Sequence, residues 1–149
     1  MTCEGKIRED LKEALKLRDK GRASILRMLL SEIKNTEIAQ REPLDDDKIL
    51  DVISKEVKQH RESIEAFKQG NRDDLVAQET AELSTLMKYL PEQMSREEIK
   101  TAAQRVIETA GVKGMKGKGS VMAQLMPQLK GKADGKEVSE IVSELLATA

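Results

Sequence analysis

Cysteine and histidine are almost absent from this sequence, which has one of each in 149 residues. The single cysteine, Cys3, cannot close an internal disulfide, so we expect a reducing, cytoplasmic setting. One cysteine and one histidine cannot supply the ligands of a zinc cluster, so we expect no metal and no cofactor. His60 falls on the apolar face of an expected helix, where packing is a more common role than catalysis. We therefore expect no enzyme activity from the chain itself.

Aromatic residues and long apolar runs are also scarce. Phe67 and Tyr89 are the only aromatic side chains, so the core must be built from Leu, Ile, Val, Ala and Met. This composition favours helices, because β-sheets are enriched in aromatic and β-branched residues. No apolar run reaches the 18 residues of a membrane span, and the N-terminal stretch lacks the apolar core of a secretory signal. We expect no membrane partner.

Apolar residues recur every three or four positions along most of the chain, which is the spacing of one helix face. Together with start and stop signals, this spacing predicts helices at about residues 7–20, 22–40, 46–67, 73–90, 96–110, 120–129 and 135–145. Two starts are especially clear. Leu44, Asp45 and Ile49 have the order of a hydrophobic staple, and Ser95 with Glu98 has that of a capping box.

Other signals are single residues. Gly21 and Gly70 are expected to end helices, and Asn71 to cap the helix that follows. Pro127 is expected to interrupt or kink the short helix that contains it. Asp134 is expected to cap the last helix, with a cost of about 1 kcal/mol if it is lost.

Pro91 and the new helix cap that follows it mark an expected domain boundary. Charge supports this division, since residues 1–94 carry 17 basic and 20 acidic side chains while residues 95–149 carry nine and seven. We predict an all-α fold with two domains. Residues 1–92 form an N-terminal antiparallel helical bundle or hairpin, and residues 93–149 form a small helical domain.

Lysines are concentrated at two glycine-containing turns, 111–119 and 130–136. Between them they carry six lysines and one acid, Asp134, in a chain whose net charge is −1. Between the turns lies an apolar run of Val121, Met122, Leu125 and Met126. Two basic loops at the ends of a short helix can converge on one surface. The lysines are Lys113, Lys116, Lys118, Lys130, Lys132 and Lys136.

The glycine-rich run 114–120 does not match a P-loop. Val112 stands where the first glycine is needed, Gly119 separates Lys118 from Ser120, and no strand precedes the run. The start of a helix beside lysines still suits phosphate, although a solvated loop accounts equally for the same residues. Base stacking has no support, because the basic segment has no aromatic residue. The remaining partners are the phosphates or shape of a folded RNA, or an acidic protein surface.

Several motifs in this order and spacing closely resemble the GatB/YqeY family. They include Val57-Lys58-Gln59 with Arg61, Ser63 and Phe67; Tyr89-Leu90-Pro91-Glu92-Gln93 with Ser95 and Glu98; Met115 through Met126-Pro127; and Lys130-Gly131-Lys132-Ala133-Asp134-Gly135 with Val138 and Val142. The resemblance covers essentially the whole chain. The motif residues that we take as structural are Tyr89, Leu90, Pro91, Gln93, Pro127, Gly131, Asp134 and Gly135.

The resemblance implies an N-terminal helical bundle followed by a three-helix domain like the tail of the GatB subunit of glutamine-dependent aminoacyl-tRNA amidotransferase. In that subunit the tail is associated with holding tRNA, and amide transfer takes place in another domain. The family label is that of a carbon–nitrogen ligase with glutamine as amido-N-donor. The residues of this sequence offer no catalytic groups for that reaction. The resemblance therefore favours a tRNA-binding accessory module that acts in translation and contacts RNA through the six lysines. The alternative is an adaptor whose N-terminal helices dock on an aminoacyl-tRNA synthetase or an amidotransferase subunit.

Overall fold

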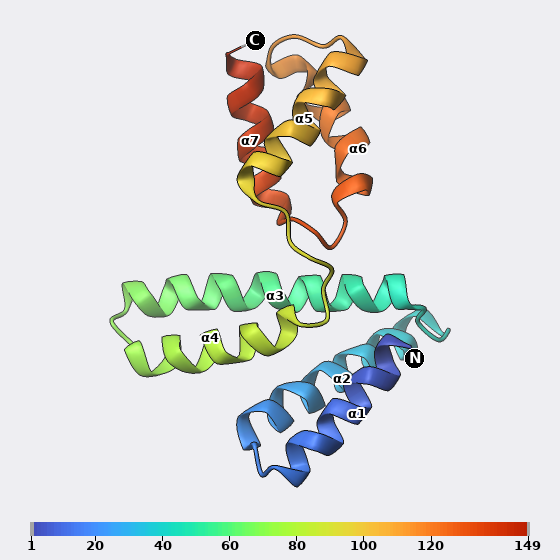
Figure 1. Cartoon of the computed structure of the whole chain (residues 1–149), viewed down its shortest axis with the longest axis vertical. Helices are drawn as coiled ribbons and strands as arrows, with labels where there is room; N and C mark the ends of the chain where they lie inside the picture. Colours follow the sequence, from blue (N-terminus) through green and yellow to red (C-terminus); the bar gives the residue numbers. More distant parts are fainter. Residues whose placement is uncertain (1, 149) are drawn as a thin grey trace. The chain divides into compact units, whose positions relative to one another are not determined.

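The computed structural model describes residues 2–148, and no strand occurs among them. The all-α prediction is therefore confirmed (Figure 1). The helices are α1 (Cys3–Lys16), α2 (Lys20–Gln40), α3 (Asp46–Gln69), α4 (Asp73–Met87), α5 (Arg96–Ala110), the 3-10 turn η1 (Met115–Gly117), α6 (Lys118–Leu129) and α7 (Gly135–Ala147). The chain divides into two compact units, and the second begins at Pro91.

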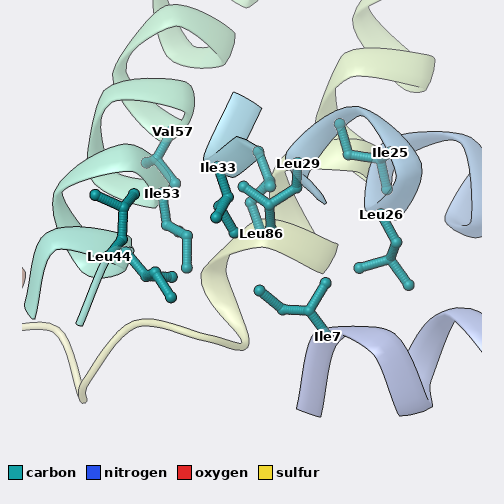
Figure 2. Close-up of a cluster of buried hydrophobic side chains, with 10 residues drawn as sticks. Ile7, Ile25, Leu26, Leu29, Ile33, Leu44, Ile53, Val57 and Leu86 are labelled. Carbon is teal, nitrogen blue, oxygen red and sulfur yellow. The ribbon is translucent and has the colours of Figure 1, made fainter. Parts of the chain in front are cut away.

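The first unit consists of two antiparallel helix pairs, α1 with α2 and α3 with α4 (Figure 1). Figure 2 shows the aliphatic side chains that hold the pairs together, with Leu86 of α4 lying among residues of α2 and α3. The expected staple is present. The Asp45 carboxylate accepts a hydrogen bond from Lys48 N–H at 2.9 Å, and both Leu44 and Ile49 are buried. The unit therefore has an aliphatic core built from four helices.

Two turns in the first unit differ from the sequence prediction. Gly21 does not end a helix but lies inside α2, because Asp19 caps the helix earlier by accepting from Arg22 N–H at 3.1 Å. Asn71 does not cap α4 either. It adopts a left-handed backbone with φ of 56° in the reversal after α3, and the position before α4 is taken by Arg72. In both places local capping geometry, rather than residue type alone, decided where the helix begins.

The second unit packs α5, α6 and α7 around a separate core that includes Ile99, Val121, Leu125, Val138 and Val142. The capping box at its start is confirmed. Glu98 N–H donates to the Ser95 hydroxyl at 3.2 Å, and Ser95 N–H donates to the Glu98 carboxylate at 3.4 Å. Small aliphatic side chains are thus enough to fill a three-helix core without any aromatic residue.

Two predictions for the second unit need correction. Pro127 does not interrupt its helix, since α6 runs continuously from Lys118 to Leu129 and the proline lies in its last turn. Asp134 occupies the N-cap position of α7 with an extended backbone, but its side chain makes no capping hydrogen bond. The stabilisation expected from that side chain therefore falls below that of a bonded cap.

Candidate nucleic-acid interface

The first lysine-bearing loop joins α5 to α6 and depends on three glycines. Gly111 and Gly114 have φ values of 66° and 72°, in the left-handed region where a side chain is strained. Gly117 is required for a steric reason, because a Cβ at this position would lie only 2.6 Å from the Cβ of Val112. The loop is therefore tightly folded. It leaves Lys113 and Lys116 exposed, with Lys118 half-buried at the start of α6.

The second loop joins α6 to α7 and is held by the segment that opens the unit. The Gln93 side chain donates two hydrogen bonds of 2.8 Å, one to the carbonyl of Pro91 and one to that of Gly131. Met94 N–H donates to the Lys132 carbonyl at 2.9 Å. Gly131 has a φ of 75°, and a Cβ there would touch the Pro91 ring at 3.6 Å.

These contacts explain why two of the motifs occur together in the sequence. The Pro-x-Gln segment and the Lys-Gly-Lys segment are 38 residues apart at Gln93 and Gly131. The Gln93 side chain and the Met94 N–H bind them together by donating to backbone carbonyls of the second segment. Lys130, Lys132 and Lys136 are exposed on this loop. The structure thus fixes the backbone of the loop while its lysines face solvent.

The two loops do not converge as the sequence suggested. One precedes α6 and the other follows it, so they lie at opposite ends of that helix (Figure 1). Twelve residues of α-helix span about 18 Å, which keeps the two lysine groups apart. The expectation of one shared basic surface is therefore wrong, and each loop is a separate cationic end of the bundle.

Tyr89, from the motif before Pro91, belongs to the first unit. Its hydroxyl donates a hydrogen bond to the Asp10 carboxylate, and the Lys6 ammonium lies 5.8 Å from the centre of its ring. Burial and the bond to Asp10 raise the pKa of Tyr89, so the phenol stays protonated and can act as the donor. Tyr89 therefore fastens the end of the unit to α1, while Leu90 packs partly buried against the same core.

The structure also reveals a polar cluster that the sequence did not predict. His60 of α3 lies against Glu79 and Glu82 of α4, with its Nε2 atom 3.5 Å and 3.0 Å from their carboxylates. Burial disfavours the charged imidazole, but the bonds to the Glu56 carbonyl and to Glu82, with the charge of Glu79, raise its pKa overall. The turn at residues 70–72 was the feature of the sequence that could have predicted this contact. In an antiparallel pair, His60 and Glu82 are equally far from Asn71 and so come side by side.

The fold and the loops define a class of protein: an all-helical chain of two units whose second unit presents lysines at both ends of a three-helix bundle. The chain belongs to the YqeY family, since the family model described as Yqey-like protein matches residues 4–146. The resemblance found in the motifs is thereby confirmed at the level of the family.

Curated relatives carry the name "Altered inheritance of mitochondria protein 41, mitochondrial". The protein of that name from Eremothecium gossypii is 41% identical over 85 residues, which cover 56% of this chain and 46% of the relative. The one from Pyrenophora tritici-repentis is 29% identical over 144 residues, which cover 95% of this chain and 79% of the relative. One from Saccharomyces cerevisiae is 38% identical over 85 residues, with 56% and 46% covered. Several of these matches thus span about half the length of the relatives.

These names correct one expectation. We predicted a cytoplasmic location from the scarcity of cysteine, and the relatives are named as mitochondrial proteins. Cysteine content reports a reducing environment, and this property does not distinguish one reducing compartment from another.

Among the described residues, no helix is both long enough and apolar enough to cross a membrane.

Proposed function

We propose that this protein is a non-catalytic accessory protein of translation that binds tRNA through the lysines of its second unit. The motifs that resemble the GatB tail support this function, because that tail is associated with holding tRNA. One observation carries the proposal furthest. Two motif segments bind each other through Gln93, and their contact holds a loop whose lysines are exposed.

In this proposal the protein contacts RNA through two separate loops rather than through one continuous surface. About 18 Å of helix separates the loops, and a folded RNA offers phosphates over a greater length, since a double-stranded-RNA domain spans about 16 base pairs. Lysines at both ends of α6 can therefore reach phosphates of one RNA at the same time. Such contacts position an RNA without reading its sequence.

The test measures the affinity of the full chain for tRNA at several salt concentrations. Because each phosphate contact releases counterions, log affinity falls with log salt, by about 0.9 per contact for duplexes and about 0.7 for single strands. Replacing Lys130, Lys132 and Lys136 by Gln should weaken binding and lower this slope by about 2. The triple variant of Lys113, Lys116 and Lys118 should have a similar or smaller effect, since Lys118 is half-buried.

A matched control separates local contacts from total charge. Lys12, Lys20 and Lys34 are exposed lysines of the first unit, and their triple Gln variant changes the net charge by the same amount. We expect it to bind tRNA like the parent chain. If all three triple variants bind equally well, or if binding does not depend on salt, the lysine loops are not an RNA interface.

A second candidate function is that of an adaptor whose first unit docks on an aminoacyl-tRNA synthetase or an amidotransferase subunit. The exposed pair Leu15 and Leu17 near the end of α1 favours it, with 47% and 66% of their surfaces accessible. We expect a Leu15→Glu, Leu17→Glu variant to lose co-purification of such a partner after nuclease treatment. If co-purification disappears with nuclease alone, RNA rather than the leucine pair mediates it.

A further inference from the structure

The cluster of His60, Glu79 and Glu82 lies within the first unit, away from the lysine loops in sequence. His60 is buried, with 8% of its surface exposed, and it comes from α3. The two glutamates are three residues apart on α4, so they share one helix face, and both contact His60 of α3. Figure 1 shows α3 and α4 as an antiparallel pair. One ligand atom from each residue lies within 4.8 Å of the others.

The hydrogen bond on the far side of the imidazole fixes its proton. Nδ1 lies 2.9 Å from the backbone carbonyl of Glu56, and a carbonyl oxygen can only accept, so Nδ1 carries the hydrogen. In a neutral ring, Nε2 then presents a lone pair. That lone pair faces the carboxylate oxygens of Glu82 and Glu79 at 3.0 Å and 3.5 Å, so three acceptors point at one another. A shared cation, either a proton on Nε2 or a metal ion, removes the repulsion among these three acceptors.

A proton satisfies this arrangement only in part. The imidazolium has one Nε2–H for two carboxylates, and the trio keeps one uncompensated negative charge. A divalent ion binds all three groups at once and balances both carboxylates. Ligands at 2.0–2.1 Å around a tetrahedral Zn²⁺ lie roughly 3.4 Å apart. The two distances from His60 Nε2, 3.5 Å to Glu79 and 3.0 Å to Glu82, are close to this spacing, and all three ligand atoms lie within 4.8 Å of one another.

Neighbouring groups orient the three ligands in the way that metal sites require. A histidine that binds metal usually donates its other N–H to a carbonyl or a carboxylate, as His60 does to the Glu56 carbonyl. The Gln78 amide lies 3.3 Å from the Glu82 Oε1 atom, so it donates to the oxygen that does not face the histidine. Glu79 and Glu82 keep 22% of their side-chain surface exposed, so an ion can enter from solvent.

We propose that His60, Glu79 and Glu82 bind one divalent transition-metal ion of the Zn²⁺ class, with a fourth position open to water. One imidazole and two carboxylates favour Zn²⁺ over Mg²⁺, which prefers oxygen ligands alone. The bound ion joins α3 to α4 and so stabilises the helix pair. This inference goes beyond tRNA binding and does not depend on it.

The test is a titration of the tag-free full chain, first stripped with a chelator, with Zn²⁺ alone. We expect one saturable site per chain, a rise in the melting temperature of the first unit, and no comparable effect of Mg²⁺. A Cys3→Ser background removes the single thiol that could bind zinc elsewhere. The Co²⁺-loaded protein should show the visible absorption of a four-coordinate site.

Variants assign the site to its residues. Glu79→Gln with Glu82→Gln keeps the side-chain shape and should reduce Zn²⁺ affinity by more than about 100-fold, which exceeds the loss from an orienting partner. Gln78→Ala removes only the group that orients Glu82, and it should cost about 10-fold. The control pair Glu62→Gln with Glu65→Gln, exposed on α3, should bind like the parent.

Two results would overturn the proposal. One is the absence of a saturable Zn²⁺ site in the stripped Cys3→Ser chain. The other is an unchanged affinity in the Glu79→Gln, Glu82→Gln variant, with circular dichroism showing that its helices are intact. Either result would leave a proton as the cation of the cluster.

Discussion

The two units use similar materials and present their polar groups in different ways. Both have aliphatic cores, and their charges are nearly balanced, with 17 basic and 19 acidic side chains up to Leu90 and nine and eight from Pro91 onward. In the first unit, the distinctive polar group, His60, is enclosed between two long helices by residues from far along the chain. In the second, the distinctive groups are lysines that neighbour one another in sequence and lie exposed on glycine loops.

This difference teaches how each kind of site arises from a helical chain. A long antiparallel pair brings together residues that are equally far from its turn, so it can build an enclosed site from scattered positions. A small bundle has little interior to spare, and its short loops carry local groups outward. The first arrangement suits an ion, and the second suits an extended polymer.

The largest effect should come from truncating a core residue in one unit alone. Leu86→Ala removes a fully buried side chain of α4, and it should lower the stability of the first unit by about 2–5 kcal/mol. Because the two cores are separate, amide hydrogen exchange in the second unit should be unchanged. Leu125→Ala is the matched change in the second core and should show the reverse pattern. Equal loss of protection in both units would mean that they unfold together.

A smaller effect should follow from releasing the loop that Gln93 holds. Gln93→Leu leaves the Pro91 and Gly131 carbonyls without this donor and should cost the second unit about 1–3 kcal/mol. The loop between α6 and α7 should also exchange its amides faster, and tRNA binding should weaken even though no lysine has changed. Gln104→Leu, at an exposed position of α5, is the control and should have little effect. Unchanged amide exchange in this loop of the Gln93→Leu variant would show that other contacts hold the backbone of the loop.

The contrast between the units also explains what the sequence could and could not predict. The presence of the helices, the staple at Asp45 and the capping box at Ser95 follow from local spacing and were confirmed. The predicted ends of two helices were wrong, since α1 ends at Lys16 rather than near residue 20 and α4 at Met87 rather than near residue 90. The lysine loops were visible because their residues are close in sequence. Their separation was missed, although a single helix between two loops must place them at its opposite ends.

The histidine cluster could not be found in the same way. His60 was assigned to packing, and metal binding was excluded by counting cysteine and histidine, a count that ignores carboxylates. Glu79 and Glu82 become its partners only through the register of α3 against α4, which depends on the turn at Asn71. Nothing in the local pattern of α4 distinguishes these glutamates from its other acidic residues. Long-range register is thus the information that spacing alone does not carry.

The smallest effect should distinguish two helix starts within the second unit. Ser95 and Asp134 occupy equivalent N-cap positions, but only Ser95 accepts a backbone hydrogen bond, from Glu98 N–H. Ser95→Ala should therefore cost about 1 kcal/mol, while Asp134→Ala loses only the interaction of a charge with the helix dipole, about 0.3–0.5 kcal/mol. Chemical denaturation of the two variants, with the unfolding of the second unit followed separately, measures the difference. A larger loss of stability for Asp134→Ala would show that its carboxylate accepts a backbone hydrogen bond in solution. The N-terminus of α7 would then be capped as well as that of α5.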